Sequence, residues 1–178
     1  MKKSIEKILF TENEIKARVK ELAADIARDF DGKELIVLTV LKGAAMLSCD
    51  LVRELPFSVT LDYLAVSSYY AGTKSTGSVQ IKKDTDINMQ GKNLLIIEDI
   101  VDSGNTLAHL IKLFQLRGAN EIKICTLLDK PARRTTPVNV DYVGFTIPDE
   151  FVVGYGLDYD QKFRNLPYIG VLKPEVYA

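Results

Sequence analysis

Mainly apolar, β-favouring runs alternate along the chain with segments in which apolar residues recur every three or four positions. The unbroken run 94–97 has the composition of a strand covered on both faces, 35–41 reads as a second buried strand, and 122–128 and 140–145 read as further strands. The periodic segments predict amphipathic helices between these strands. Strand and helix in alternation predict an α/β fold, with a central, mainly parallel sheet flanked by helices.

The first predicted helix carries its own start signal. Thr11 and Glu14 have the spacing of a capping box, which predicts a helix beginning at Glu12. Its apolar stripe includes Ile15 and Ile26, and nothing in it suggests chemistry. We expect this helix to pack against the core.

A long polar segment, 67–78, separates a predicted strand at 61–66 from its predicted partner at 79–81. Its twelve residues exceed an ordinary hairpin loop. Loops of this length are either disordered or functional lids, and the residues alone leave both alternatives open. The segment 82–86 that follows the second strand reads as a solvated turn.

The stretch 93–107, NLLIIEDIVDSGNTL, carries the clearest chemical signal. Its apolar run ends in Glu98 and Asp99, where we expect the strand to leave the sheet. The small residues 102–106 then form a turn into a helix containing Leu107, so that the turn presents backbone amides and hydroxyls at a helix N-terminus. Such a terminus favours an anion.

The two halves of this stretch attract opposite groups, because Ser103 to Thr106 form a phosphate cradle whereas Glu98 and Asp99 repel phosphate. A phosphorylated sugar satisfies both halves, with its phosphate on the helix terminus and its hydroxyls donating to the carboxylates. The plainer alternative is that the acids only cap the strand end and the first helical turn.

A second turn of the same kind follows the strand 35–41. Lys42 and Gly43 lead into a helix running through Met46 and Leu51. In isolation this is an ordinary connection with a solvated lysine. In a parallel sheet, however, both turns lie at the carboxyl edge, where open α/β folds bind ligands.

Length and composition limit the remaining possibilities. The 178 residues, 47% of them hydrophobic, suit one domain spanning 1–178. The formal net charge of −1 provides no large basic field, so we expect no nucleic-acid partner. Cys49 and Cys125 lie in apolar segments without ligand spacing, which predicts buried, reduced thiols. The polar start at 1–6 and the absence of a membrane-length apolar run predict a cytoplasmic protein without a membrane partner.

The motifs together resemble those of the type I phosphoribosyltransferases, and among these the bacterial hypoxanthine-guanine phosphoribosyltransferases. The Glu-Asp and Asp-Ser-Gly-Asn-Thr pattern looks like their phosphoribosyl diphosphate signature. Further matching stretches cover nearly the whole chain: 41–44, 68–69, 128–130, 151–159 and Arg164. The resemblance implies the type I phosphoribosyltransferase fold, with a small hood and a flexible lid loop, and a peptide between Leu41 and Lys42 that can be cis.

The resemblance also implies roles for individual residues. Those that bind the phosphoribosyl and diphosphate groups are Lys42, Gly43, Ser68, Tyr69, Glu98, Asp99, Asp102, Ser103, Gly104, Asn105, Thr106 and Arg164. Magnesium, the implied cofactor, is held by Glu98, Asp99 and Asp158, directly or through water. Gly154 and Gly156 do not form a dinucleotide fingerprint, because no third glycine follows at the required spacing.

The same family pattern assigns the purine site to Lys130, Phe151, Val152 and Asp158. Asp102 is the implied catalytic residue and exchanges a proton with N7 of the purine. Lys130 donates to the carbonyl on carbon 6, and Phe151 stacks on the ring. Without the family match these residues are, respectively, a helix cap, a surface lysine and a core aromatic residue.

The implied reaction transfers the phosphoribosyl group of phosphoribosyl diphosphate to hypoxanthine or guanine, giving IMP or GMP and diphosphate. Relatives of this kind commonly assemble as homodimers or homotetramers. A rival hypothesis is a nucleotide-sensing regulator that keeps the pocket and binds RNA. The near-neutral charge and the presence of both Asp102 and Lys130 argue against that alternative.

Overall fold

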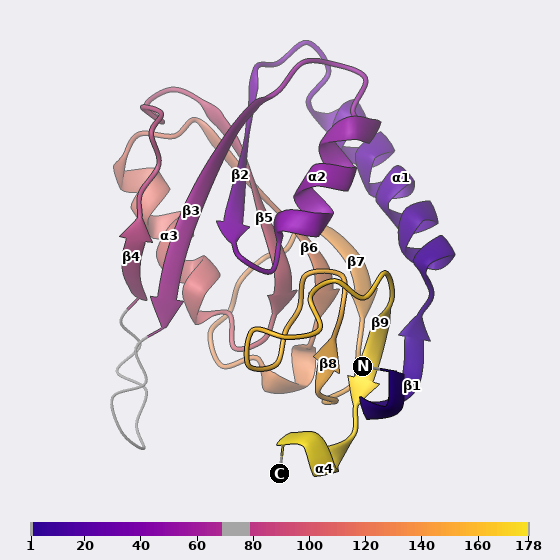
Figure 1. The fold of residues 1–178 in the computed structure, drawn as a ribbon. Helices are drawn as coiled ribbons and strands as arrows, with labels where there is room; N and C mark the ends of the chain where they lie inside the picture. The colour runs from indigo at the N-terminus through magenta and orange to yellow at the C-terminus, as the bar shows by residue number, and fades with distance from the viewer. Residues whose placement is uncertain (1, 69–78, 178) are drawn as a thin grey trace.

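The computed structural model describes residues 2–68 and 79–177 (Figure 1). Ser68 is the last residue of β3, whereas Tyr69 and the rest of the predicted lid lie outside the described residues. The elements are β1 (Ile5–Phe10), α1 (Glu12–Asp29), β2 (Leu35–Leu41), α2 (Ala45–Glu54), β3 (Thr60–Ser68), β4 (Val79–Lys83), β5 (Asn93–Val101), α3 (Asn105–Leu116), β6 (Glu121–Asp129), β7 (Tyr142–Thr146), β8 (Val152–Val153), β9 (Ile169–Leu172) and α4 (Pro174–Tyr177).

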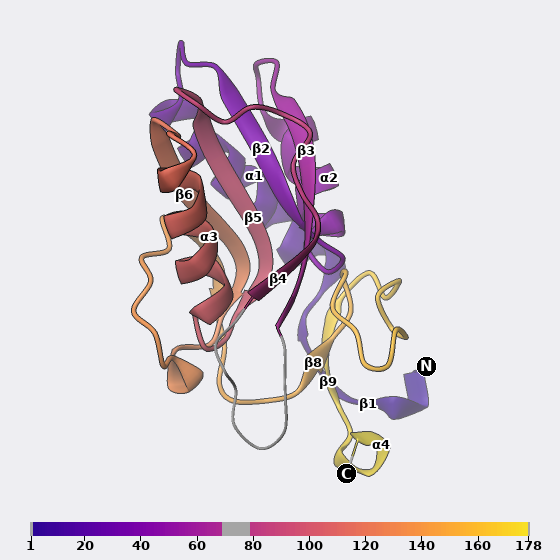
Figure 2. The ribbon, with the colours of Figure 1, turned by 90° about the vertical axis from the view of Figure 1, so that its left-hand side faces the viewer.

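A six-stranded sheet with the order β4-β3-β2-β5-β6-β7 forms the centre of the molecule. All its pairings are parallel except that of β4 with β3. Helices α1 and α2 cover one face and α3 covers the other (Figures 1 and 2). The predicted parallel α/β sheet is therefore confirmed, including the antiparallel pairing of the strands on either side of the long polar segment.

The start of α1 follows the predicted pattern. Thr11 Oγ accepts from the backbone N–H of Glu14 at 3.3 Å, and the Glu14 carboxylate accepts from the backbone N–H of Thr11 at 2.8 Å. The residues of its apolar stripe, including Ile15 and Ile26, are fully buried. The capping box and the packing role of α1 are confirmed.

A separate three-stranded antiparallel sheet, in the order β1-β9-β8, forms the hood predicted from the family resemblance. Figure 2 shows this sheet and the loop between β8 and β9 to one side of the carboxyl edge of the main sheet. The loop contains every described residue other than glycine with a positive φ: Tyr155, Asp160, Gln161 and Phe163. Strained backbone of this kind often occurs at binding sites.

Several local predictions were wrong. Strand β5 continues through Val101, so Glu98 and Asp99 lie within the strand, where pairing with β6 extends the ladder. Lys82 and Lys83 belong to β4 rather than to a turn. Cys49 is exposed, because it lies on the outer side of α2, whereas Cys125 is buried as predicted. Strand β7 begins at Tyr142, two residues later than predicted.

Within the described residues, no helix combines the length and the apolar character needed to cross a membrane.

Candidate active site

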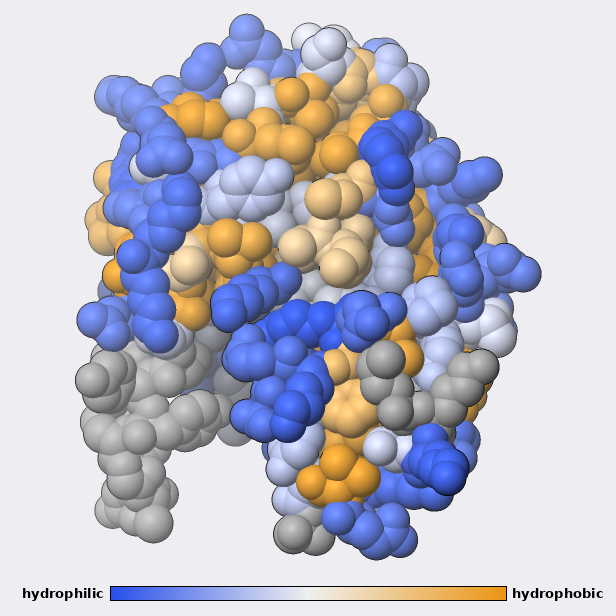
Figure 3. Space-filling view, in the orientation of Figure 1, coloured by the Kyte–Doolittle hydropathy of each residue, from blue (hydrophilic) through white to orange (hydrophobic). Residues whose placement is uncertain are grey.

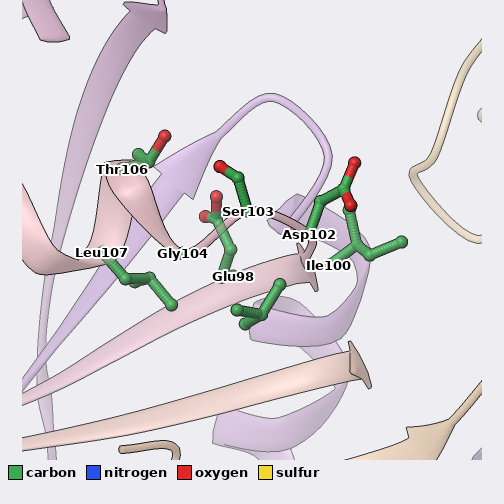
Figure 4. A pocket seen from close by; sticks show the side chains of 8 residues that line it. Glu98, Ile100, Asp102, Ser103, Gly104, Thr106 and Leu107 are labelled. Atoms are coloured by element: carbon green, nitrogen blue, oxygen red, sulfur yellow. The ribbon is translucent and has the colours of Figure 1, made fainter. Parts of the chain in front are cut away.

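The turn between β5 and α3 surrounds a cavity of about 190 Å³. In Figure 4 the side-chain oxygens of Glu98, Ser103 and Thr106 point to the same side of the turn, and Asp102 stands at its other end. Gly104 caps α3 with φ +86°, and the first amides of a helix have no intrahelical acceptor. The cavity therefore combines anion-binding amides and hydroxyls with a carboxylate below them.

The segment after β6 holds this turn in place. The backbone N–H groups of Thr135 and Thr136 both donate to Ser103 O at 3.0 Å. The Thr136 hydroxyl donates to the Asn105 side chain, which thus faces this segment. A Cβ on Gly104 would lie 2.5 Å from Thr136 O, so glycine is needed for the close approach as well as for the positive φ.

A second cavity, of about 230 Å³, adjoins the first, and both are lined by Glu98 and Thr106. The remaining lining residues come from the end of β2 and the turn after it, from β3, from β5 and from the hood loop: Val40, Leu41, Lys42, Gly43, Val66, Asp99, Asp158 and Arg164. The peptide between Leu41 and Lys42 is cis. The structure thus brings the predicted diphosphate-binding residues of three separate segments to one edge of the sheet.

Cationic side chains in this cavity are connected by Gln161. Its side-chain oxygen accepts from Lys42 Nζ at 3.1 Å and from Arg164 Nη2 at 3.3 Å. Arg164 also forms an ion pair with Asp158 at 2.8 Å and donates to Gly156 O at 2.7 Å. Sequence reasoning missed Gln161, because a polar residue in a loop has no distinguishing pattern.

The two acids of β5 are held in an environment that favours their neutral forms. Burial, and secondarily the neighbouring Asp99, raise the pKa of Glu98 well above its usual range. Burial raises the pKa of Asp99 to about 6. Among the described residues, Glu98 Oε2 and Asp102 Oδ1 are buried without a hydrogen-bond partner. Ligand hydroxyls are suitable donors for such oxygens.

Replacing Asp99 by asparagine should stabilise the ligand-free protein in a pH-dependent way. The raised pKa means that the folded state binds this proton more tightly than the unfolded state, so ionisation destabilises the fold as pH rises from about 4 to about 6. Asp99→Asn removes that penalty and should raise the melting temperature by about 3–8 °C at about pH 8, with little change at about pH 4.

Thermal unfolding of both proteins at the two pH values measures this difference. Asp25→Asn, a change on the exposed side of α1, is the matched control and should show no such pH dependence. Equal shifts in melting temperature for Asp99→Asn at both pH values would contradict the raised pKa of Asp99.

The strand end of β6 supplies the predicted purine-binding lysine. Lys130 is only 7% exposed, and its Nζ donates to Glu150 O at 2.9 Å. Phe151, the next residue in the chain after Glu150, is 38% exposed and begins the segment leading into β8, where Val152 is buried. The structure therefore brings Lys130 close to the chain at Phe151, and the surface-lysine alternative is wrong.

Two arginines after Lys130 contact the same region, and only one of them is exposed. Arg134 is largely buried: it forms an ion pair with Asp129 and its Nε donates to Asp102 O at 3.1 Å. Arg133 is exposed and forms a 2.8 Å ion pair with Asp149, and its Nη1 lies 4.0 Å from Asp102 Oδ2. Arg134 thus ties the end of β6 to the backbone of the β5–α3 turn.

The carboxylates of the second cavity are suited to bind magnesium together with a substrate. No three His, Cys, Asp or Glu side chains of the described part of the chain lie close enough to hold a metal by themselves. Asp99 and Asp158 line the same cavity, and the charge of Asp158 contributes to the raised pKa of Asp99. Magnesium is commonly held by one or two carboxylates together with substrate phosphates, and this donor set fits that pattern.

Comparison with known proteins agrees with this geometry. Residues 7–160 match the family model of the phosphoribosyl transferase domain. The hypoxanthine-guanine phosphoribosyltransferase of Bacillus subtilis is 50% identical over 177 residues, which cover 99% of this chain and 98% of that protein. The chain belongs to the hypoxanthine-guanine phosphoribosyltransferases. Membership of this family also accounts for the three-stranded hood beside the sheet.

A solved structure and a longer relative extend the comparison. The crystal structure of a hypoxanthine phosphoribosyltransferase from Staphylococcus aureus superposes with a TM-score of 0.97 at 49% identity and covers 100% of this chain and 97% of that one. The bifunctional protein TilS/HprT of Listeria innocua is 47% identical, and this phosphoribosyltransferase chain spans 28% of its length.

Proposed function

We propose that the protein transfers the phosphoribosyl group from phosphoribosyl diphosphate to hypoxanthine or guanine. Purine N9 forms a bond with carbon 1 of the ribose as the bond from that carbon to diphosphate breaks, so the products are IMP or GMP and diphosphate. The observation that carries the proposal is the meeting, at one sheet edge, of an anion-binding turn, buried carboxylates and a cluster of cations. These groups match the phosphate, the sugar and the diphosphate of one substrate.

Opposite charges develop at the two sides of the breaking bond. The leaving diphosphate is highly anionic, and Lys42 and Arg164 lie where cations would stabilise it. The ribosyl centre becomes cation-like, and Glu98 and Asp99 hold its hydroxyls on the other side. Ser103 and Thr106 bind the 5-phosphate. The residues of the chain thus orient the sugar and balance both charges.

Magnesium, when bound with the substrate, would supply further positive charge to the diphosphate oxygens. Asp99 and Asp158 are the residues that would hold it, and Glu98 lies beside them. Chelation of magnesium should therefore abolish turnover, and added magnesium should restore it. Side chains of the protein orient the substrates and transfer the proton.

Asp102 accepts the proton that the purine loses at N7 as N9 attacks. Lys130 donates to the carbonyl on carbon 6, a position at which adenine carries an amine. Since lysine has donors and no acceptor, this contact selects 6-oxopurines over adenine. Phe151 covers one face of the base.

Replacing Lys130 by methionine should raise KM for hypoxanthine and guanine by about 10–100-fold, because a hydrogen bond from a charged donor is lost. The methionine keeps most of the buried apolar length, and KM for phosphoribosyl diphosphate should change little. Initial rates with each substrate varied in turn measure the two effects. An equal rise in both KM values would remove Lys130 from the purine site.

The direct test mixes the protein with magnesium, phosphoribosyl diphosphate and one base at a time. We expect nucleotide from hypoxanthine and guanine and none from adenine. Absence of nucleotide with every 6-oxopurine would refute the proposal. Tight, strongly salt-dependent binding of RNA would favour the rival regulator, although the net charge of −1 offers it no support.

A further inference from the structure

The C-terminal helix places an aromatic ring against the proposed purine wall. Tyr177 stacks on Phe151 with a centroid separation of 4.8 Å and an interplanar angle of 21°. Tyr159 meets the Phe151 ring edge-on at 5.7 Å. We propose that Tyr177 is a positioning residue for purine binding and fixes the Phe151 ring in the orientation that stacks on the base. This inference rests on the proposed function.

Main-chain contacts hold α4 at this position. The Leu172 N–H at the end of β9 donates to Phe151 O at 2.8 Å, so the strand before α4 is tied to Phe151 itself. The Lys173 N–H donates to Ser4 O at 3.0 Å, and Val176 packs against the hydrophobic cluster of the hood. The stacking of Tyr177 on Phe151 therefore follows from backbone that is anchored both at Phe151 and just before α4.

The position of α4 indicates support of the ring rather than blockage of the site. Figure 2 shows α4 beyond the hood strands, on the side away from α3 and the β5–α3 turn. Asp102 belongs to that turn, and Lys130 follows the neighbouring strand β6. A base held by these two residues therefore lies on the β5–α3 side of the hood strands, whereas Tyr177 belongs to α4 beyond them. One ring face is then available for the base while Tyr177 covers the other.

Support of this kind matters because Phe151 is partly exposed and, besides Tyr177, its ring meets Tyr159 only edge-on. Phe151 is 38% exposed, and Tyr177 itself is 39% exposed. An exposed aromatic side chain samples several rotamers, and fixing one of them before the ligand arrives lowers the entropy cost of binding. Tyr177 should therefore affect affinity for the base and leave the phosphoribosyl end of the site unchanged.

The test begins with the wild-type protein, hypoxanthine, phosphoribosyl diphosphate and magnesium. Nucleotide formation establishes the proposed function, and its absence would refute that function separately. Tyr177→Ala should then raise KM for hypoxanthine about 3- to 10-fold, as expected for loss of one aromatic pair, with little change in kcat or in KM for phosphoribosyl diphosphate. Tyr177→Phe keeps the ring and should retain the wild-type KM.

Two further variants separate positioning from a general structural effect. Tyr63→Ala removes a tyrosine of similar exposure, 37%, on β3 and should leave every kinetic constant unchanged. In a Phe151→Ala background, Tyr177→Ala should have no additional effect on KM for hypoxanthine, because Tyr177 acts only through that ring. An unchanged or lowered KM for hypoxanthine in Tyr177→Ala, an equal rise in both KM values, or an additive effect in the double variant would overturn the proposal.

Discussion

Replacing Asp102 by asparagine should lower kcat by about 10²–10⁴-fold and leave the fold intact. Asparagine has nearly the same shape but does not accept a proton at neutral pH. Asp102 stands at one end of the β5–α3 turn and lines the cavity there, and one of its carboxylate oxygens is buried without a hydrogen-bond partner. The only histidine in the chain, His109, is exposed on α3 and does not line the cavity, so it offers no substitute base.

Initial rates at saturating hypoxanthine and phosphoribosyl diphosphate measure this effect, and thermal unfolding verifies that the variant is folded. Asp25→Asn is the matched control, because Asp25 is an exposed acid of similar accessibility on α1. Its kcat should equal that of the wild type. Undiminished turnover in Asp102→Asn would show that another group takes the purine proton.

Much of the fold was predictable because strong local signals agree with the long-range arrangement. Strand β2 has the predicted bounds, 35–41, since an unbroken β-favouring run has few alternative structures. The start of α1 followed from Thr11 and Glu14. Strand ends were less predictable. The unbroken apolar run stops at Ile97, where Glu98 and Asp99 interrupt it, but backbone pairing with β6 carries β5 through these two acids to Val101.

In the site, too, features with a local sequence signal were predictable, whereas features that depend on long-range contacts were not. Residues in turns after strands were found, because a parallel sheet brings the carboxyl ends of its strands together. Gln161, Arg134 and Tyr177 were missed, because their importance comes from contacts across 119, 32 and 26 residues of chain. Only the folded structure reveals such contacts. Arg134 illustrates the point, since it joins the end of β6 to the turn after β5.

Electrostatics explains why the site is formed at a cost to the ligand-free fold. Two neighbouring acids, Glu98 and Asp99, lie half-buried near the end of β5, and desolvation there raises the pKa of each. A fold selected only for stability would not keep this pair. Under the proposed function, sugar hydroxyls and a shared cation would provide the missing partners, so substrate binding should relieve the penalty. Function and stability therefore make opposite demands on these two positions.

Replacing Gly43 by alanine should have the second large effect, a loss of about 10²-fold or more in kcat/KM for phosphoribosyl diphosphate. A Cβ at this position would lie 1.5 Å from Asp99 Oδ2 and 2.4 Å from Asp99 Cγ. The methyl group and the carboxylate cannot occupy the same space. Either the Asp99 side chain leaves the cavity or the turn carrying Lys42 moves away from β5, and both changes disrupt the diphosphate site.

A double-mutant cycle identifies Asp99 as the group that clashes. Gly43→Ala alone should lower the free energy of unfolding by about 1–3 kcal/mol, as overpacking does. Asp99→Ala removes the carboxylate and makes room for the methyl group, so Gly43→Ala should cost little stability in that background. The contrary result is that Gly43→Ala destabilises the Asp99→Ala protein as much as it destabilises the wild type. In that case the methyl group clashes with a different part of the structure. The close contact between the β2 turn and β5 would then not be the reason for glycine at position 43.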